Sequence, residues 1–212
     1  MRTKFLLLAA SGLIAACAGS TPPPPNWQAN AHLALKNFET AYLEGNTRLA
    51  DAEFTRARAE VAATGRPAVA ARVELARCAV QTASLVFDEC PGFQPLAVDA
   101  DAEERAYADY LAGRWQGLDA KRLPAHHQPV IAGGALPTDP MARLVAAGAM
   151  LRAGRITPAV IAAAAETASA NGWRRPLAAW LGVEEKRALS AGDTEAAAQI
   201  RRRIELVVKG GR

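Results

Sequence analysis

The sequence predicts an all-α protein made of antiparallel helix pairs, and three observations lead to that prediction. Alanine is abundant and aromatic residues make up only 6% of the chain, which favours helices because alanine loses no side-chain entropy in them. Apolar residues recur at the three- and four-residue spacing of one helix face. Glycine and proline separate these stretches, as they commonly do at helix ends.

The N-terminal residues form an element of a different kind, which precedes the helices. Two basic residues, Arg2 and Lys4, are followed by an apolar run over residues 5–16. This run is shorter than the roughly 20 residues that a transmembrane helix needs. It ends in the letters LIAAC at residues 13–17, a pattern that resembles the lipobox of bacterial lipoproteins. An ordinary signal peptide with an incidental cysteine is the alternative.

The resemblance to lipoproteins implies that residues 1–16 are a signal peptide and that Cys17 becomes an acylated N-terminus, anchored in a membrane. Ala18, rather than aspartate, follows the cysteine, and in that family this implies sorting to the outer membrane, with the protein facing the periplasm. Four prolines at residues 22–25 favour a stiff polyproline II spacer. Residues 17–29 are therefore predicted to be a lipid anchor and a proline-rich tether.

The first predicted helices cover residues 30–44, 47–63 and 68–87, where apolar residues such as Phe38 and Phe54 follow helical spacing. The breaks between them fall at Gly45-Asn46 and at residues 65–67, and a Pro-Gly pair at residues 91–92 ends the third helix.

A second group of helices is predicted at residues 141–153, 159–170, 176–190 and 194–208, with Thr157 as an N-cap before Pro158. The middle of the chain holds one helix, over residues 102–112. Residues 123–140 then contain four prolines, which predicts a long irregular connection. The helical domain is therefore expected to span residues 30–208, as two similar halves of about 30–93 and 137–208 joined by an irregular segment.

The two halves share an internal spacing. Gly45 to Pro67 and Gly154 to Pro176 are both 22 residues apart, and Gly192-Asp193 begins a third, shorter copy. This arrangement resembles the tetratricopeptide repeat, in which a glycine turn closes the first helix of each pair. The first copy matches the family at Gly45, Asn46, Ala50, Phe54 and Ala57.

The later copies match the repeat family only in part, and the first helices lack its usual aromatic and leucine residues. The resemblance implies stacked helix pairs, with a concave binding face at positions such as Lys36, Asn37 and Thr40. A compact alanine-rich helical bundle is the alternative fold.

Cys78 and Cys90 are the only cysteines besides Cys17. In an exported protein they meet an oxidising environment, and the Pro-Gly pair at residues 91–92 lets the chain turn back toward the third helix. We therefore predict a structural disulfide between them. Buried free thiols, or a reactive cysteine, are the alternatives.

The net charge excludes few classes of function by itself. The chain carries 25 basic and 21 acidic residues, a formal net charge of +4, and loss of Arg2 and Lys4 with the signal leaves 23 against 21, or +2. This weak excess gives no reason to expect nucleic acid as a partner, and export would place the protein in the wrong compartment for it.

No motif predicts a catalytic residue, a cofactor or a metal. His126-His127 has no acidic residue or cysteine at ligand spacing, so a solvated loop is expected. The acidic pair Glu103-Glu104 is expected to face solvent, and the three arginines at residues 201–203 to flank an apolar stripe. The four tryptophans, Trp27, Trp115, Trp173 and Trp180, are expected to pack inside the protein.

These observations favour a lipid-anchored envelope protein that acts as a non-enzymatic scaffold or adaptor for a protein or peptide partner. A cell-wall enzyme or the activator of one, and a structural subunit of an envelope transport or secretion assembly, are the alternatives. A deep pocket with paired ionisable groups would favour the enzyme. A large exposed apolar patch would favour the subunit.

Overall fold

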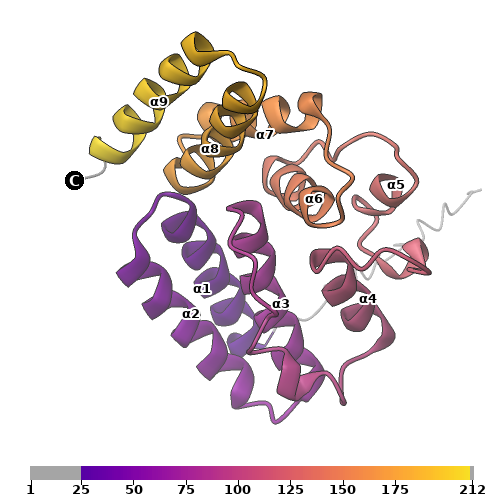
Figure 1. Ribbon diagram of the computed structural model, residues 1–212. Helices are drawn as coiled ribbons and strands as arrows, with labels where there is room; N and C mark the ends of the chain where they lie inside the picture. Colours follow the sequence, from indigo (N-terminus) through magenta and orange to yellow (C-terminus); the bar gives the residue numbers. More distant parts are fainter. Residues whose placement is uncertain (1–24, 211–212) are drawn as a thin grey trace, which may run out of the picture.

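The protein is all-α, as predicted. The computed structural model describes residues 25–210, so the predicted signal peptide, Cys17 and most of the tether lie outside the described residues. Within them the chain forms helices and no strand (Figure 1). The α-helices are α1 (Asn26–Leu43), α2 (Thr47–Ala62), α3 (Pro67–Ala83), α4 (Ala102–Leu111), α5 (Gln128–Ile131), α6 (Pro140–Arg152), α7 (Pro158–Ala170), α8 (Arg174–Ser190) and α9 (Thr194–Lys209).

Three helix pairs share one kind of turn: α1 with α2, α6 with α7, and α8 with α9. Each first helix ends at a glycine with positive φ: Gly45 at 88°, Gly154 at 68° and Gly192 at 78°. The N–H after each glycine donates to the carbonyl five residues before it, at 2.8 or 2.9 Å. This left-handed cap suits glycine, which lacks the Cβ that would clash. The recurring glycine in the sequence therefore marks a recurring helix end.

Helix α3 occupies the centre of the molecule. Val73 and Val80 on α3 belong to the core that α1 and α2 form around Phe38 and Phe54. Other faces of α3 belong to a second core, with residues of α4, α6, α7 and α8. Because α3 contributes to both clusters, it ties the N-terminal hairpin to the rest of the fold.

Helix α8 joins the C-terminal part of the fold to the ends of α1 and α3. Trp180 is fully buried, and its Nε1 donates to the carbonyl of Ala83 at the end of α3, at 3.1 Å. At the start of α8, Arg174 donates to the carbonyl of Glu44 at 2.7 and 3.0 Å. Arg175 donates to the carbonyl of Tyr42 at 2.7 Å and lies over the Tyr42 ring, 4.2 Å from its centroid. These arginines bind carbonyls at the C-terminal end of α1, where the regular helical hydrogen-bond pattern stops.

Several helix ends differ from the prediction. α1 begins at Asn26, four residues before the predicted start, because Trp27 packs against the N-terminal core and extends the helix into the predicted tether. α3 ends at Ala83 rather than near residue 87, because Leu85 adopts a positive φ of 58° and the N–H of Val86 closes the turn onto Gln81. The predicted connection over residues 123–140 contains the short helix α5.

Within residues 25–210, no helix is both long enough and apolar enough to cross a membrane.

Candidate functional site

A cleft of about 990 Å³ lies between α1, α3, α4 and the start of α6. These helices come from distant parts of the sequence and surround the middle of the molecule (Figure 1). The segment at residues 121–127 borders the cleft as well. A volume of this size is at the upper end of the range for small-molecule sites, about 300–1,000 Å³.

The cleft combines an apolar lining with charged side chains. Its apolar residues include Leu35, Phe38, Leu75, Ala79, Val80, Met141 and Val145. Its polar and charged residues are His32, Lys36, Glu39, Arg72, Glu103, Glu104, Tyr107, Lys121, Arg122, His126, His127 and Asp139. One helix can supply both apolar and charged residues to the lining. Residues three or four positions apart share a helix face, whatever their chemical type. On α1, for example, His32, Lys36 and Glu39 follow this spacing.

Glu104 is the most buried charged residue of the cleft, with 5% of its side chain exposed. Its Oε1 accepts from Nε of Arg72 on α3, and this pairing raises the pKa of the Arg72 guanidinium. The same arginine also lies 3.6 Å from a carboxylate oxygen of Asp101. The expectation that Glu103-Glu104 faces solvent is therefore right for Glu103 and wrong for Glu104. Glu104 shares the buried face of α4 with Ala108 and Leu111, at helical spacing that the sequence contains.

His127 packs in an aromatic cluster and is 1% exposed. Its Nδ1 lies 3.2 Å from the hydroxyl of Tyr110, and its ring packs against Tyr107 and Tyr110. Burial, with a smaller contribution from His126, lowers the pKa of His127 to about 3, so the imidazole is neutral at physiological pH. Burial also raises the pKa of Tyr107 and of Tyr110, which keeps both hydroxyls protonated.

The expectation of a solvated loop at His126-His127 is thus right for His126 and wrong for His127. His126 is exposed, whereas the aromatic residues of α4 enclose His127. Trp115 completes the cluster by stacking on Tyr110 and donating from Nε1 to the Tyr110 carbonyl at 2.9 Å. Sequence spacing contains no sign of this, because Tyr110 and His127 are 17 residues apart.

Glu39 and Asp139 bring two carboxyl groups into the lining of the cleft. Burial raises the pKa of Glu39, and the charge of Asp139 adds to the effect. Asp139 is fixed by a local role, because its side chain caps α6 by accepting from the N–H of Ala142 at 2.8 Å. The pairing joins residues 100 positions apart and could not be seen in the sequence.

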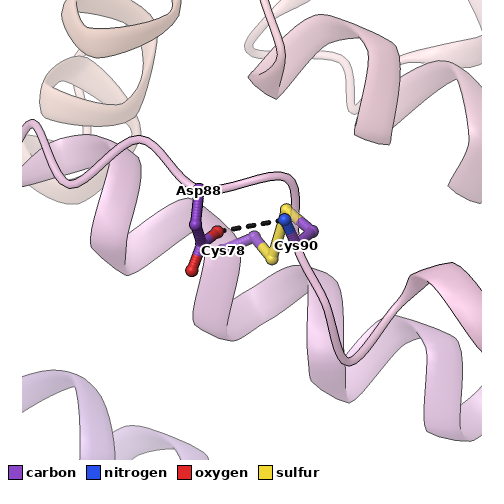
Figure 2. A group of neighbouring side chains, drawn as sticks. All are labelled: Cys78, Asp88 and Cys90. Carbon is purple, nitrogen blue, oxygen red and sulfur yellow. Dashed lines mark hydrogen bonds between the residues drawn. A yellow bond between two sulfur atoms is a disulfide. The ribbon is translucent and has the colours of Figure 1, made fainter.

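Cys78 and Cys90 lie at disulfide distance, with their Cα atoms 5.7 Å apart, as the sequence predicted. Figure 2 shows Asp88 beside them, where its Oδ1 accepts from the N–H of Cys90 at 3.0 Å. Among the described residues, Cys78, Asp88 and Cys90 are the one group with metal-ligand spacing. If the predicted disulfide joins the two sulfurs, the group offers no thiolate ligand.

The disulfide should contribute about 3 kcal/mol to stability, because it closes a loop of about a dozen residues in the unfolded chain. A Cys78→Ala/Cys90→Ala double variant should lose this amount in urea unfolding without added reductant. The control is the wild-type protein with reductant, which should lose a similar amount. If neither treatment shifts the unfolding midpoint, the two thiols are not bonded in the native protein.

The other predicted residues are distributed as follows. Lys36 lines the cleft, whereas Asn37 and Thr40, its neighbours on α1, do not. Trp115 and Trp180 are buried and Trp27 and Trp173 are partly buried, so packing is confirmed for all four. Residues 201–203 are exposed, and Arg201 and Arg203 pair with Glu185 and Glu184 of α8. They flank the half-buried residues Ile200 and Ile204, as predicted.

Comparison of the chain with known protein families, curated proteins and solved structures found no match. The resemblance to the tetratricopeptide repeat therefore has no support beyond the sequence spacing itself.

Proposed function

We propose that this protein is a lipid-anchored adaptor of the bacterial cell envelope that binds a partner protein in the cleft between α1, α3, α4 and α6. The observation that carries the proposal is the cleft itself, which presents an apolar lining between charged side chains from five segments of the chain. Peptide segments dock in grooves of this kind, with apolar side chains in the groove and polar groups at its edge.

Two sequence features support the envelope part of the proposal. The LIAAC pattern at residues 13–17 predicts acylation of Cys17, which would tether the domain to the outer membrane on its periplasmic side. The cysteine pair at residues 78 and 90, at disulfide distance, suits an oxidising compartment. A Cys17→Ser variant should lose the incorporation of labelled fatty acid that the wild-type protein shows in growing cells.

Photo-crosslinking in intact cells tests partner binding. A photoreactive residue at Lys36, which is exposed and lines the cleft, should give one discrete crosslinked product. The same residue at Gln199, which is exposed on α9 and lies outside the cleft, should give none. Equal products from the two positions, or none from Lys36, would refute docking in the cleft.

A cell-wall hydrolase is a second candidate, and the raised pKa of Glu39 beside Asp139 favours it. Glycoside hydrolysis uses one protonated carboxyl as a general acid and a second carboxylate on the other side of the scissile bond. If this candidate is right, Glu39→Gln should reduce the release of soluble fragments from purified cell walls at least a hundredfold. Glu44→Gln, an exposed position just after α1, should leave it unchanged. No release by the wild-type protein would exclude this candidate.

A further inference from the structure

One oxygen of the Glu104 carboxyl group is buried without a partner. Oε1 accepts from Arg72, but Oε2 makes no hydrogen bond with any residue in the described range 25–210. Buried polar atoms in proteins are nearly always hydrogen-bonded, and an unpaired one calls for an explanation. Glu104 lines the cleft, so a molecule bound there is in a position to supply the missing donor.

The charges around Glu104 favour a cation as that donor. Arg72 pairs with two carboxyl groups, those of Glu104 and Asp101. Glu103 pairs separately with Arg122, at 3.6 Å. His127, which also lines the cleft, is neutral, and the ion-pair partner of Glu104 is Arg72 rather than Lys36 or Lys121. Arg72, Glu104 and Asp101 together therefore carry one negative charge in excess.

Tyr107 adds an aromatic ring beside the carboxyl group. It lies three residues after Glu104 on α4, so the two side chains share a helix face, and both line the cleft. A cation is attracted to the face of an aromatic ring as well as to a carboxylate. The apolar lining of the cleft, which includes Leu75 and Val80, suits the methylene groups that would carry such a cation.

The number of unpaired oxygens on the Glu104 carboxyl group indicates whether an arginine or a lysine side chain fits better. A guanidinium binds a carboxylate best with two parallel N–H groups, which requires both oxygens. Here Arg72 already occupies Oε1. A single free oxygen matches one N–H of a compact ammonium group.

We propose that the cleft recognises a lysine side chain on an extended segment of the partner protein, whose ammonium group donates to Oε2 of Glu104 beside the ring of Tyr107. This rests on the proposed docking function and gives it a chemical specificity. An extended segment fits better than a small amine alone, because the lining runs from α1 to α6 and exceeds what one side chain can fill.

The first test uses n-butylammonium, which corresponds to the lysine side chain, and n-butanol as its neutral counterpart. Full-length protein in detergent micelles is titrated with each and followed by amide NMR shifts. The ammonium should bind at least tenfold more tightly than the alcohol and should shift the amide signals of Glu104 and Tyr107. Equal affinity for the two probes would overturn the proposal.

Three variants show whether Glu104 is responsible for the binding of butylammonium. Glu104→Gln keeps an acceptor for Arg72 but loses the charge, and should weaken butylammonium binding at least tenfold. Asp109→Asn makes the same change on α4 at a residue that pairs with Arg114 outside the cleft, and should change binding less than twofold. Arg72→Gln removes the competing cation and should strengthen binding, a result that a merely structural role would not produce. Equal effects of Glu104→Gln and Asp109→Asn would refute recognition of the ammonium group by Glu104.

Binding measurements with peptides show whether the cleft recognises a protein segment or a free amine. An acetylated and amidated pentapeptide with a central lysine between leucines should bind at least tenfold more tightly than butylammonium. It should also bind at least tenfold more tightly than the same peptide with norleucine in place of lysine. A lysine peptide that binds no better than butylammonium would refute recognition of an extended segment.

The crosslinking experiment at Lys36 separates failure of this inference from failure of the proposed function. Crosslinks that persist at wild-type yield in Glu104→Gln would leave the docking function standing and would refute lysine recognition. Loss of the crosslink in Glu104→Gln but not in Asp109→Asn supports both.

Discussion

Gly148→Ala should destabilise the protein by about 3 kcal/mol or more, a large part of the typical total of about 5–15 kcal/mol. Gly148 lies in α6 where that helix crosses α3. A Cβ atom there would lie 2.2 Å from the carbonyl oxygen of Thr82 and 2.9 Å from its carbonyl carbon. Since these are backbone atoms, no side-chain rotation relieves the clash, and the two helices would have to separate. Chemical denaturation followed by circular dichroism measures the effect.

Gly182→Ala is the matched control for this prediction. Gly182 also lies inside a helix, α8, but no atom outside its own helix turn would come within 4 Å of a Cβ atom at that position. Alanine should therefore stabilise the protein by about 0.5–1 kcal/mol, which is the difference in helix propensity. Opposite signs for the same substitution would establish the close approach of α3 and α6. A Gly148→Ala protein as stable as the wild type would contradict it.

Acid should destabilise the protein through His127. The pKa of this group falls from 6.5 to about 3 on folding, so below pH 6.5 the unfolded chain binds a proton that the folded protein excludes. Stability contributed by His127 is therefore complete above pH 6.5 and is lost as the pH falls toward 3. One proton changes stability by about 1.4 kcal/mol per pH unit, which gives a loss of about 2–3 kcal/mol between pH 7 and pH 4.5.

His127→Asn should remove this part of the pH dependence, because asparagine does not titrate and its amide can still form a hydrogen bond with the Tyr110 hydroxyl. The measured quantity is the difference in unfolding free energy between pH 7 and pH 4.5. The packing energy that the substitution removes is the same at both pH values, so it cancels in this difference. His32→Asn is the control, since His32 is exposed on α1, does not contribute to the pKa of His127 and should leave that difference unchanged. If His127→Asn retains the full acid sensitivity, His127 is protonated in the folded protein.

Features governed by neighbouring residues could be predicted from the sequence. Thr157 and Asp193 cap their helices by accepting backbone N–H groups three residues ahead, and Gly45 and Gly154 end theirs with positive φ. In each case the residue type dictates the local conformation. The cysteine pair could be predicted because few alternatives existed for two cysteines twelve positions apart.

Features that depend on tertiary packing could not be predicted. Leu85 ends α3 in a left-handed conformation that favours glycine, and no local signal marks it. His127 is buried because α4 brings Tyr107 and Tyr110 to it. Glu104 could have been placed on the buried side of α4 from its spacing to Ala108, but its unpaired oxygen follows only from the packing around it.

The arginines at the start of α8 also bear on the order in which the chain acquires its structure. They bind the turn after α1 across 128–133 positions of sequence. In an open array of repeats, each unit rests only on its neighbours and can form as it is synthesised. Here the N-terminal hairpin waits for residues made about 130 positions later, so it lacks its final contacts until α8 is available. Contacts of such long range slow folding, so we expect the N-terminal hairpin to reach its final structure only when α8 has formed.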